Sequence, residues 1–142
     1  KDGEVIFKKY SPMGDLAEFA GKICESLKLN TGHPAAVADR DTVIALSGAN
    51  RRSLLERNGS LALQRLMEGR QTYRYRPGDQ RLPVTADNDE YFIAVASPIL
   101  SQGDVMGCVL LLMGSGEGYA PTEFDERLLQ TVSGFLGRQM EA

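Results

Sequence analysis

Residues 90–114 read EYFIAVASPILSQGDVMGCVLLLMG, and we expect the rest of this 142-residue chain to be arranged around them. Two runs rich in Val, Ile, Leu and aromatic residues, 91–100 and 105–113, flank the polar residues Ser101-Gln102-Gly103-Asp104. This composition favours strands, and the polar residues predict an antiparallel hairpin with a four-residue loop. Neither run alternates between apolar and polar residues, so both faces of the hairpin should be covered at the centre of a sheet. Because Pro98 cannot donate to a strand ladder, we expect a bulge or a gap in pairing there.

Two long helices are predicted, one near each end of the sequence. Ser11-Pro12 supplies an N-cap and a first-turn proline for the first helix, which Asn30-Thr31-Gly32 ends. Thr122 and Asp125 form a capping-box pattern at the start of the second helix. Helically spaced apolar residues mark the two buried stripes: Leu16, Ala20, Ile23 and Leu27 in the first helix, and Phe124, Leu128, Val132, Phe135, Leu136 and Met140 in the second. Such stripes predict that the two helices pack antiparallel to each other.

Shorter elements are predicted between the first helix and the central hairpin. Residues 35–39 and 42–46 form a second hairpin, and Asn50 and Ser60 cap two short helices. Residues 71–76 alternate like an edge strand, with Tyr73 and Tyr75 on one face. A long loop at 77–89 and a glycine-rich linker at 114–118 complete the chain. The order of elements predicts an α+β fold in which a central antiparallel sheet carries the terminal helices together on one face.

The composition indicates a single globular domain without a membrane span. The hydrophobic fraction is 42% and the charged fraction 25%, as in ordinary globular proteins. The longest apolar runs, 91–96 and 108–113, are much shorter than the roughly 20 residues that a spanning helix needs. Cys24 and Cys108 are expected to be buried, reduced thiols, and a disulfide or metal pair is the alternative. We therefore expect a cytoplasmic protein with no membrane partner.

Charge is distributed unevenly along the chain, although the net charge is only −3. Eight arginines and three acidic residues give residues 51–81 a net charge of +5, whereas residues 82–142 carry −7. The basic segment could meet an anionic ligand or a partner, or it could form a solvated face with local ion pairs.

The sequence contains no recognisable catalytic pattern. His33, the one histidine, follows a glycine and precedes a proline, so it reads as a hinge residue more readily than as a general base. Asp39 and Asp41 flank Arg40 at a hairpin corner, where turn chemistry explains them as well as cation binding does. Motifs such as GxSxG, HExxH and Walker A are absent. We expect no catalytic residues, no metal ion and no cofactor.

Three segments carry a resemblance to a known family: DGEVIFKKYSP at 2–12, GHPAAVADRDTVIALSG at 32–48 and TVSGFLGRQME at 131–141. They resemble the stage V sporulation protein T family of regulators from spore-forming bacteria, and the resemblance is weaker over 51–89. That family joins an AbrB-like, swapped-hairpin DNA-binding domain to a C-terminal GAF domain. The resemblance implies that residues 1–10 are the last strand of the AbrB-like domain and a linker. Residues 11–142 would then form a GAF-like regulatory domain.

The resemblance also implies a function in transcription regulation during sporulation. A GAF-like domain of such a regulator would bind a small ligand, mediate oligomerisation, or do both, and so modulate DNA binding by the N-terminal domain. DNA would be contacted only through that domain. The alternative is a purely structural oligomerisation module with no small-molecule ligand.

Two candidate sites follow from these expectations. GAF-like folds hold ligands between the sheet and the connecting segments, where arginines could clamp an anionic metabolite and tyrosines could wall the cavity. The candidate ligand residues are Arg51, Arg70, Tyr73, Tyr75, Arg76 and Tyr91. Alternatively, the tyrosines fill the core and the arginines pair with Asp87, Asp89 and Glu90.

The second candidate site is a dimer interface on the two terminal helices, with a tetramer expected in a full-length protein. Apolar residues beyond those that the sheet covers would be buried by a second copy. The candidate interface residues are Leu16, Phe19, Ile23, Leu27, Leu128, Val132, Phe135 and Leu136.

Overall fold

The protein is described here by a computed structural model, which gives the backbone of residues 12–141 and the side chains of residues 17–141. Four helices are described: α2 (Pro12–Thr31), α3 (Arg51–Leu54), α4 (Leu61–Gly69) and α5 (Glu123–Gln139). Five strands are described: β1 (Ala35–Asp39), β2 (Val43–Ser47), β3 (Tyr73–Arg74), β4 (Tyr91–Ser101) and β5 (Asp104–Gly114). The strand expected within residues 1–10, the Ser11 cap and the Leu16 side chain lie outside the described part.

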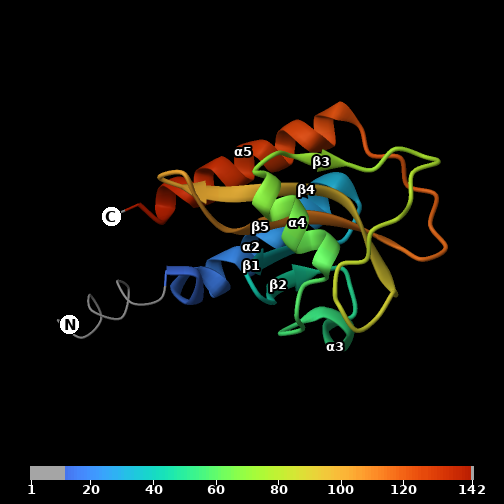
Figure 1. Cartoon of the computed structure of the whole chain (residues 1–142), viewed down its shortest axis with the longest axis horizontal. Helices are drawn as coiled ribbons and strands as arrows, with labels where there is room; N and C mark the ends of the chain where they lie inside the picture. Colours follow the sequence, from blue (N-terminus) through green and yellow to red (C-terminus); the bar gives the residue numbers. More distant parts are fainter. Residues whose placement is uncertain (1–11, 142) are drawn as a thin grey trace.

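The strands form one antiparallel sheet in the order β2-β1-β5-β4-β3. The hairpin of β4 and β5 lies at its centre, and most residues of both strands are buried. In Figure 1, α4 crosses in front of the sheet, α2 lies behind it and α5 runs along the top. The predicted α+β class, with a central antiparallel sheet and both long helices on one face, is confirmed.

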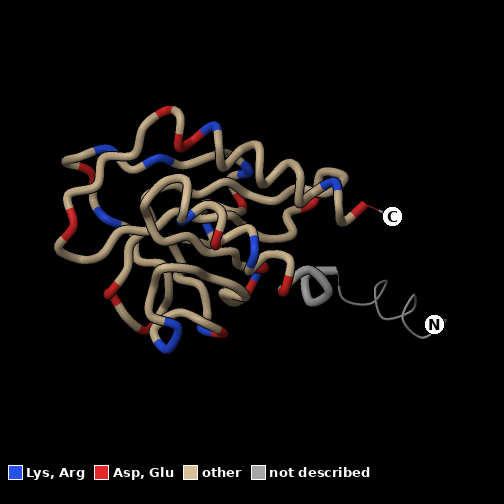
Figure 2. Tube along the Cα trace, turned by 180° about the vertical axis from the view of Figure 1, so that it is seen from behind, with Lys and Arg blue, Asp and Glu red and all other residues tan. Residues whose placement is uncertain are grey.

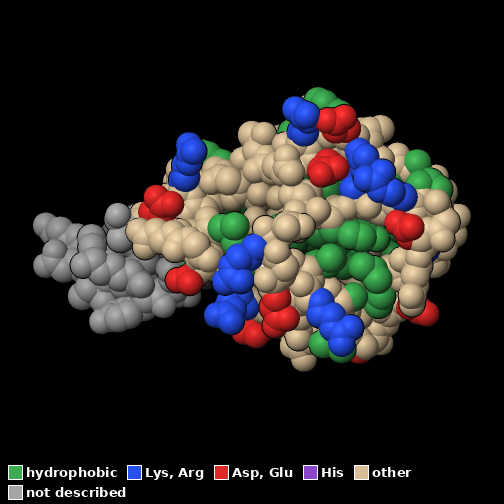
Figure 3. Space-filling view, turned by 45° about the horizontal axis from the view of Figure 1, so that its top comes forward, with side chains coloured by type: hydrophobic (Ala, Val, Ile, Leu, Met, Phe, Trp, Pro, Cys, Tyr) green, Lys and Arg blue, Asp and Glu red, His purple; other side chains and the backbone are tan. Residues whose placement is uncertain are grey.

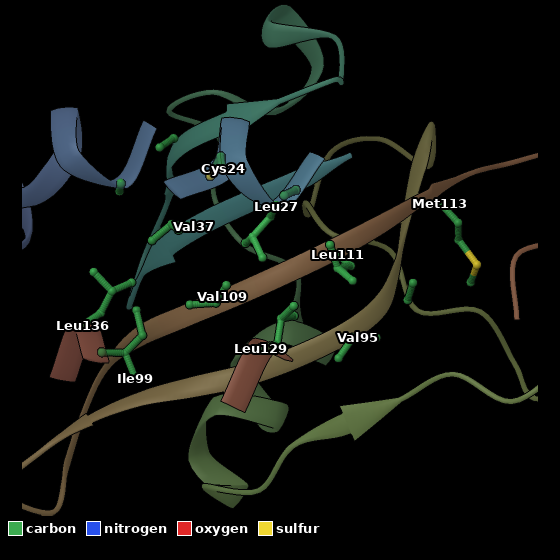
Figure 4. Packing of buried hydrophobic residues seen from close by; sticks show 14 of the residues in the cluster. Cys24, Leu27, Val37, Val95, Ile99, Val109, Leu111, Met113, Leu129 and Leu136 are labelled. Atoms are coloured by element: carbon green, nitrogen blue, oxygen red, sulfur yellow. The ribbon is translucent and has the colours of Figure 1, made fainter. Parts of the chain in front are cut away.

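Each face of the sheet has its own hydrophobic core. The core on the α2/α5 side includes Cys24 and Leu27 of α2, Val109 of β5 and Leu129 and Leu136 of α5 (Figure 4). The core on the α4 side contains Leu54, Leu63 and Met67 against Leu110 and Leu112 of β5. Because successive residues of β5 enter opposite cores, the strand is apolar throughout, as residues 105–113 indicate in the sequence.

The turn of the central hairpin is tighter than the predicted four-residue loop. Ser101 and Asp104 pair across the strands, which leaves only Gln102 and Gly103 in the turn. Their φ angles are 54° and 87°, and two positive φ values are characteristic of the type I′ turns that match the twist of paired strands. Pro98 itself pairs with Cys108, and the irregularity in pairing follows between Ile99 and Leu100. The irregularity expected at Pro98 therefore lies one residue further along β4.

The predicted alternation of residues 71–76 is wrong beyond Arg74. Tyr73 pairs with Ala96 of the α4-side core and, partly buried, packs against both cores, whereas Tyr75 is buried in the α2/α5-side core. The cause is a bulge in β4 between Ile93 and Val95, which places Ala94 and Val95 in the same core. Neither tyrosine is among the lining residues of the two hollows described below.

Helix α5 is rotated relative to the predicted stripe, although Leu136 is buried and Leu128, Val132 and Met140 still pack against the α2/α5-side core. Its buried residues are Asp125, Leu129, Ser133, Leu136 and Gly137, and Phe124 of the predicted stripe is 67% exposed. Gly137 explains the rotation, because a Cβ at this position would collide with the carbonyl oxygen of Leu100 in β4. The α5 backbone therefore comes close to the β4 backbone at this glycine. The larger residues Leu128, Val132 and Phe135 are left at the side of the helix, only partly covered.

Candidate functional sites: a helical groove and a hairpin cleft

An apolar groove of about 330 Å³ runs between α2 and α5. We call it the helical groove; it is lined by Ile23, Ser26, Leu27, Asn30, Leu128, Thr131, Val132 and Phe135. The rings of Phe19 and Phe135 close one end, with centroids 6.0 Å apart. Early residues of α2 thus lie near late residues of α5, so the helices run antiparallel as the stripes predict, but each packs mainly on the sheet and not on the other helix. None of the eight lining residues is charged.

The predicted interface residues divide into exposed and buried groups. Phe19 and Phe135 are 39% and 46% exposed, and Ile23, Leu128 and Val132 are partly buried in the groove. Leu27 and Leu136 are only 3% and 1% exposed, because both pack into the α2/α5-side core. Leu27 and Leu136 therefore offer a partner little surface of their own.

A second hollow of about 690 Å³ lies beside α4. We call it the hairpin cleft, and it is lined by Arg40, Asp41, Gln64, Met67, Glu68, Arg70, Asp104, Val105 and Met106. These residues come from the β1–β2 turn, from α4 and its C-cap residue Arg70, and from the start of β5, just after the hairpin turn. The cleft is mostly polar at its rim, with Met67 buried at its base. Space-filling atoms show acidic and basic side chains interspersed over one face of the molecule (Figure 3).

The predicted ligand residues do not gather at one place. Arg70 lines the hairpin cleft, whereas Arg51 and Arg76 are exposed elsewhere, at the start of α3 and after β3. The Tyr91 hydroxyl accepts a hydrogen bond of 2.9 Å from the backbone N–H of Asn50. Burial, with a smaller contribution from the nearby carboxylate of Asp79, raises the pKa of Tyr73.

Arg81 is an anchoring residue that sequence reasoning missed. Its guanidinium donates to the carbonyl oxygens of Gly114, Ser115 and Glu117, at 3.4, 3.1 and 2.7 Å, and lies 5.8 Å from the centre of the Tyr75 ring. These contacts tie the 77–89 loop to the glycine-rich linker. The only signal in the sequence was an arginine within a long loop, because its partners are backbone atoms.

His33 lies against Tyr119 and Glu117, in a cluster of side chains near the start of α5. Its ring stacks on Tyr119 with centroids 3.5 Å apart, and Nδ1 lies 3.3 Å from Oε2 of Glu117. The Tyr119 hydroxyl donates to Asp125, which also completes the predicted capping box with Thr122. Burial and this carboxylate raise the pKa of the Tyr119 hydroxyl. The cluster joins the segment after α2 to the start of α5.

Polar side chains connect α5 to β4 and to Thr72, the residue before β3. Ser133 of α5 lies 2.7 Å from Ser97 of β4, and Ser97 lies 3.4 Å from the Thr72 hydroxyl. Gln130 donates to Thr72 at 3.1 Å. The ion pair between Arg74 and Glu126 adds a fourth link. The segment that follows Arg70 is thus held to α5 by polar contacts of Thr72 and Arg74.

Metal and membrane sites are not found in the described part of the chain. No group of three His, Cys, Asp or Glu side chains is arranged to hold a metal ion there. The Asp39 carboxylate instead accepts from the backbone N–H groups of Asp41 and Thr42, which is the turn chemistry expected at that corner. The described helices include none with the length and apolar character that crossing a bilayer requires.

The fold is that of a GAF domain. The GAF domain/HD domain protein from Geobacter sulfurreducens matches with a TM-score of 0.65 at 16% identity, over 92% of this chain and 94% of that one. The cofactor-binding GAF domain of the nutrient sensor CodY from Clostridium difficile matches with a TM-score of 0.55 at 11% identity, over 93% and 95% of the two chains. At such low identity the likeness defines the fold alone.

The particular family follows from sequence similarity. The family described as stage V sporulation protein T C-terminal, transcription factor, matches residues 15–141. Stage V sporulation protein T from Bacillus subtilis (strain 168) is 32% identical over 141 residues, which are 99% of this chain and 78% of that protein. The chain therefore belongs to the stage V sporulation protein T family, as a GAF-fold domain of the kind found at the C-terminus of these transcription factors.

Proposed function

We propose that this chain is a regulatory module that assembles as a dimer through the α2/α5 layer, and that assembly modulates DNA binding by an AbrB-like domain. Residues 1–10 are proposed to be the last strand of that domain and its linker. The observation that carries the proposal is the helical groove, an apolar surface on the helices that flank the GAF fold.

A second copy of the chain is the occupant that this surface fits. In a two-fold interface the same patch faces itself, so charges in the patch would oppose like charges. The groove avoids that cost because its lining is uncharged, and its polar members Ser26, Asn30 and Thr131 stand beside Ile23, Leu128 and Val132. Phe19 and Phe135 provide aromatic anchors of the type that dominates interface energies.

Two phenylalanines of α5 allow a matched test. Phe135 is in the groove and 46% exposed, whereas Phe124 is 67% exposed and lies outside the groove. Light scattering should show a dimer for the unmodified chain and for Phe124→Asp. Phe135→Asp should raise the dissociation constant of the dimer about tenfold or more, because a carboxylate would be buried without a partner. A monodisperse monomer of the unmodified chain at high concentration would refute the proposed assembly.

Small-molecule sensing is a second candidate function, which the hairpin cleft favours. The volume of the cleft is within the usual range of small-molecule sites. Arg70, one of the residues proposed from the sequence to clamp an anionic metabolite, lines this cleft. Native mass spectrometry of the purified chain tests this function, since a retained compound would appear as an added mass.

A further inference from the structure

The hairpin cleft carries charges of both signs that are not paired with each other. Arg40 and Arg70 line it together with Asp41, Glu68 and Asp104. All five are exposed. Within residues 17–141, none of the ion pairs closer than 4.0 Å involves any of these five side chains. Both kinds of charge are therefore available to a bound molecule.

The walls of the cleft are fixed to one another before any ligand arrives. Arg70 has a left-handed backbone, with φ of 55°, and its Nε donates to the carbonyl oxygen of Gly103 in the hairpin turn at 3.2 Å. The backbone N–H of Gly59 donates to the carbonyl oxygen of Asp41 at 2.9 Å, which ties the β1–β2 turn to the segment before α4. A site whose walls are pre-positioned loses little conformational entropy on binding.

We propose that the hairpin cleft binds a small zwitterion, a molecule that carries an ammonium and a carboxylate on an apolar body, such as a free amino acid or a dipeptide. The carboxylate would be met by Arg40 and by Nη2 of Arg70, because Nε and Nη1 of Arg70 donate to the carbonyl oxygens of Gly103 and Glu68. The ammonium would be met by carboxylates that line the same cleft, among them Asp104. The apolar body would rest on Met67, Val105 and Met106. This inference rests on the sensing function proposed above and specifies its ligand class.

The balance of charges distinguishes a zwitterion from the alternatives. Two arginines and three acidic residues line the cleft, so a simple anion would meet more negative than positive charge there. A simple cation would leave both guanidiniums without a partner. A molecule with both charges can satisfy both sets at once, and the methionines suit apolar bodies of varied shape.

Binding in the hairpin cleft would affect the proposed dimer interface, because the hairpin turn connects the cleft to α5. Arg70 contacts Gly103 of the turn, and Leu100, three residues earlier, is in close backbone contact with Gly137 of α5. A ligand that orders the Asp104 side of the turn therefore acts on a segment that supports α5.

Isothermal titration of the 142-residue chain tests the proposal with defined probes. The probes are leucine and methionine as free amino acids, and leucyl-leucine as a dipeptide. Leucine amide lacks the carboxylate, and N-acetyl-leucine lacks the ammonium. We expect at least one zwitterionic probe to bind, and its counterpart lacking either charge to bind about tenfold more weakly or worse. A preference for leucyl-leucine over leucine would assign the site to peptides.

Variants of exposed side chains connect the binding to the cleft. Arg40→Gln and Asp104→Asn should each weaken binding of the zwitterionic probe about tenfold, whereas Arg52→Gln, exposed and outside the cleft, should leave it unchanged. Absence of binding by all three zwitterionic probes, equal binding of the blocked compounds, or insensitivity to Arg40→Gln would overturn the proposal. If native mass spectrometry nevertheless shows a retained compound that lacks one of the two charges, the ligand class alone has failed and the proposed sensing function stands. A dimer that depends on Phe135 in the same preparation would show separately that the proposed assembly is unaffected.

Discussion

Arg81 and Arg70 show how single side chains position the surface of this domain. Each arginine donates to backbone carbonyl groups far away in the sequence, Arg81 to residues 114, 115 and 117 and Arg70 to Gly103. The sequence predicted a clamp for an anion because arginines are abundant in this segment. It could not identify these contacts, because a carbonyl acceptor has no signature in the side-chain sequence. Arg40 was assigned only to a turn, although that turn forms a wall of the hairpin cleft.

The two cysteines were predicted to be buried thiols, and this is confirmed. Burial raises the pKa of Cys24 from 9.0 to about 12, and it also raises the pKa of Cys108. A raised pKa in the folded state means that the folded protein holds these protons more tightly than the unfolded chain does. Their contribution to stability is therefore complete below pH 9 and is lost as the pH rises toward 12.

Unfolding by urea at a series of pH values should reveal this loss. Between pH 9 and 10, the free energy of unfolding should fall by up to about 1.4 kcal/mol per pH unit for each thiol. Cys24→Ala will lower stability at every pH, but its stability should decline less steeply in this range. Equal slopes for the variant and the unmodified chain would show that Cys24 does not titrate as proposed.

At the scale of elements, periodicity located the helices and strands well and their faces less well. The capping residues Asn50, Ser60 and Thr122 all act as predicted, because a cap depends on residues close in sequence. The faces depend on contacts with distant elements. The bulge in β4 moves Tyr75 to the other core, and the close approach at Gly137 rotates the stripe of α5.

Gly134 and Gly137 allow a matched test of that close approach. Both lie in α5, but an added Cβ at Gly134 meets nothing within 4 Å, whereas one at Gly137 collides with the Leu100 backbone. Gly134→Ala should stabilise the fold by up to about 1 kcal/mol, through helix propensity. Gly137→Ala should destabilise it, because overpacking costs about 1 to 3 kcal/mol and exceeds that gain.

Thermal and urea unfolding would measure both glycine variants. If Gly137→Ala proved as stable as Gly134→Ala, α5 would have room to move away from β4. The small residues would then not be the reason for the exposure of Phe135.

The whole molecule mixes charges that the sequence keeps apart. Residues 51–81 are basic and the residues after them acidic, yet the fold brings the two segments together, and charges of both signs are spread around the trace (Figure 2). Arg57 pairs with Asp87 and Arg74 with Glu126, each pair joining the basic segment to the acidic one. This agrees with the alternative of a solvated face with local ion pairs, and it leaves little reason to expect a basic surface for nucleic acid.

Duplex DNA is therefore expected to bind this 142-residue chain weakly or not at all. Non-specific affinity comes mainly from lysine and arginine contacts to phosphates, and here the net charge is −3 and at least two arginines of the basic segment are paired with carboxylates. Any residual binding at low salt should disappear near 200 mM salt, since counterion release makes such affinity fall steeply with ionic strength. A gel-shift titration with a duplex and a scrambled control sequence measures this. Tight retention that distinguishes the two duplexes would mean that the GAF-fold domain itself reads DNA, contrary to the proposed division of labour with an AbrB-like domain.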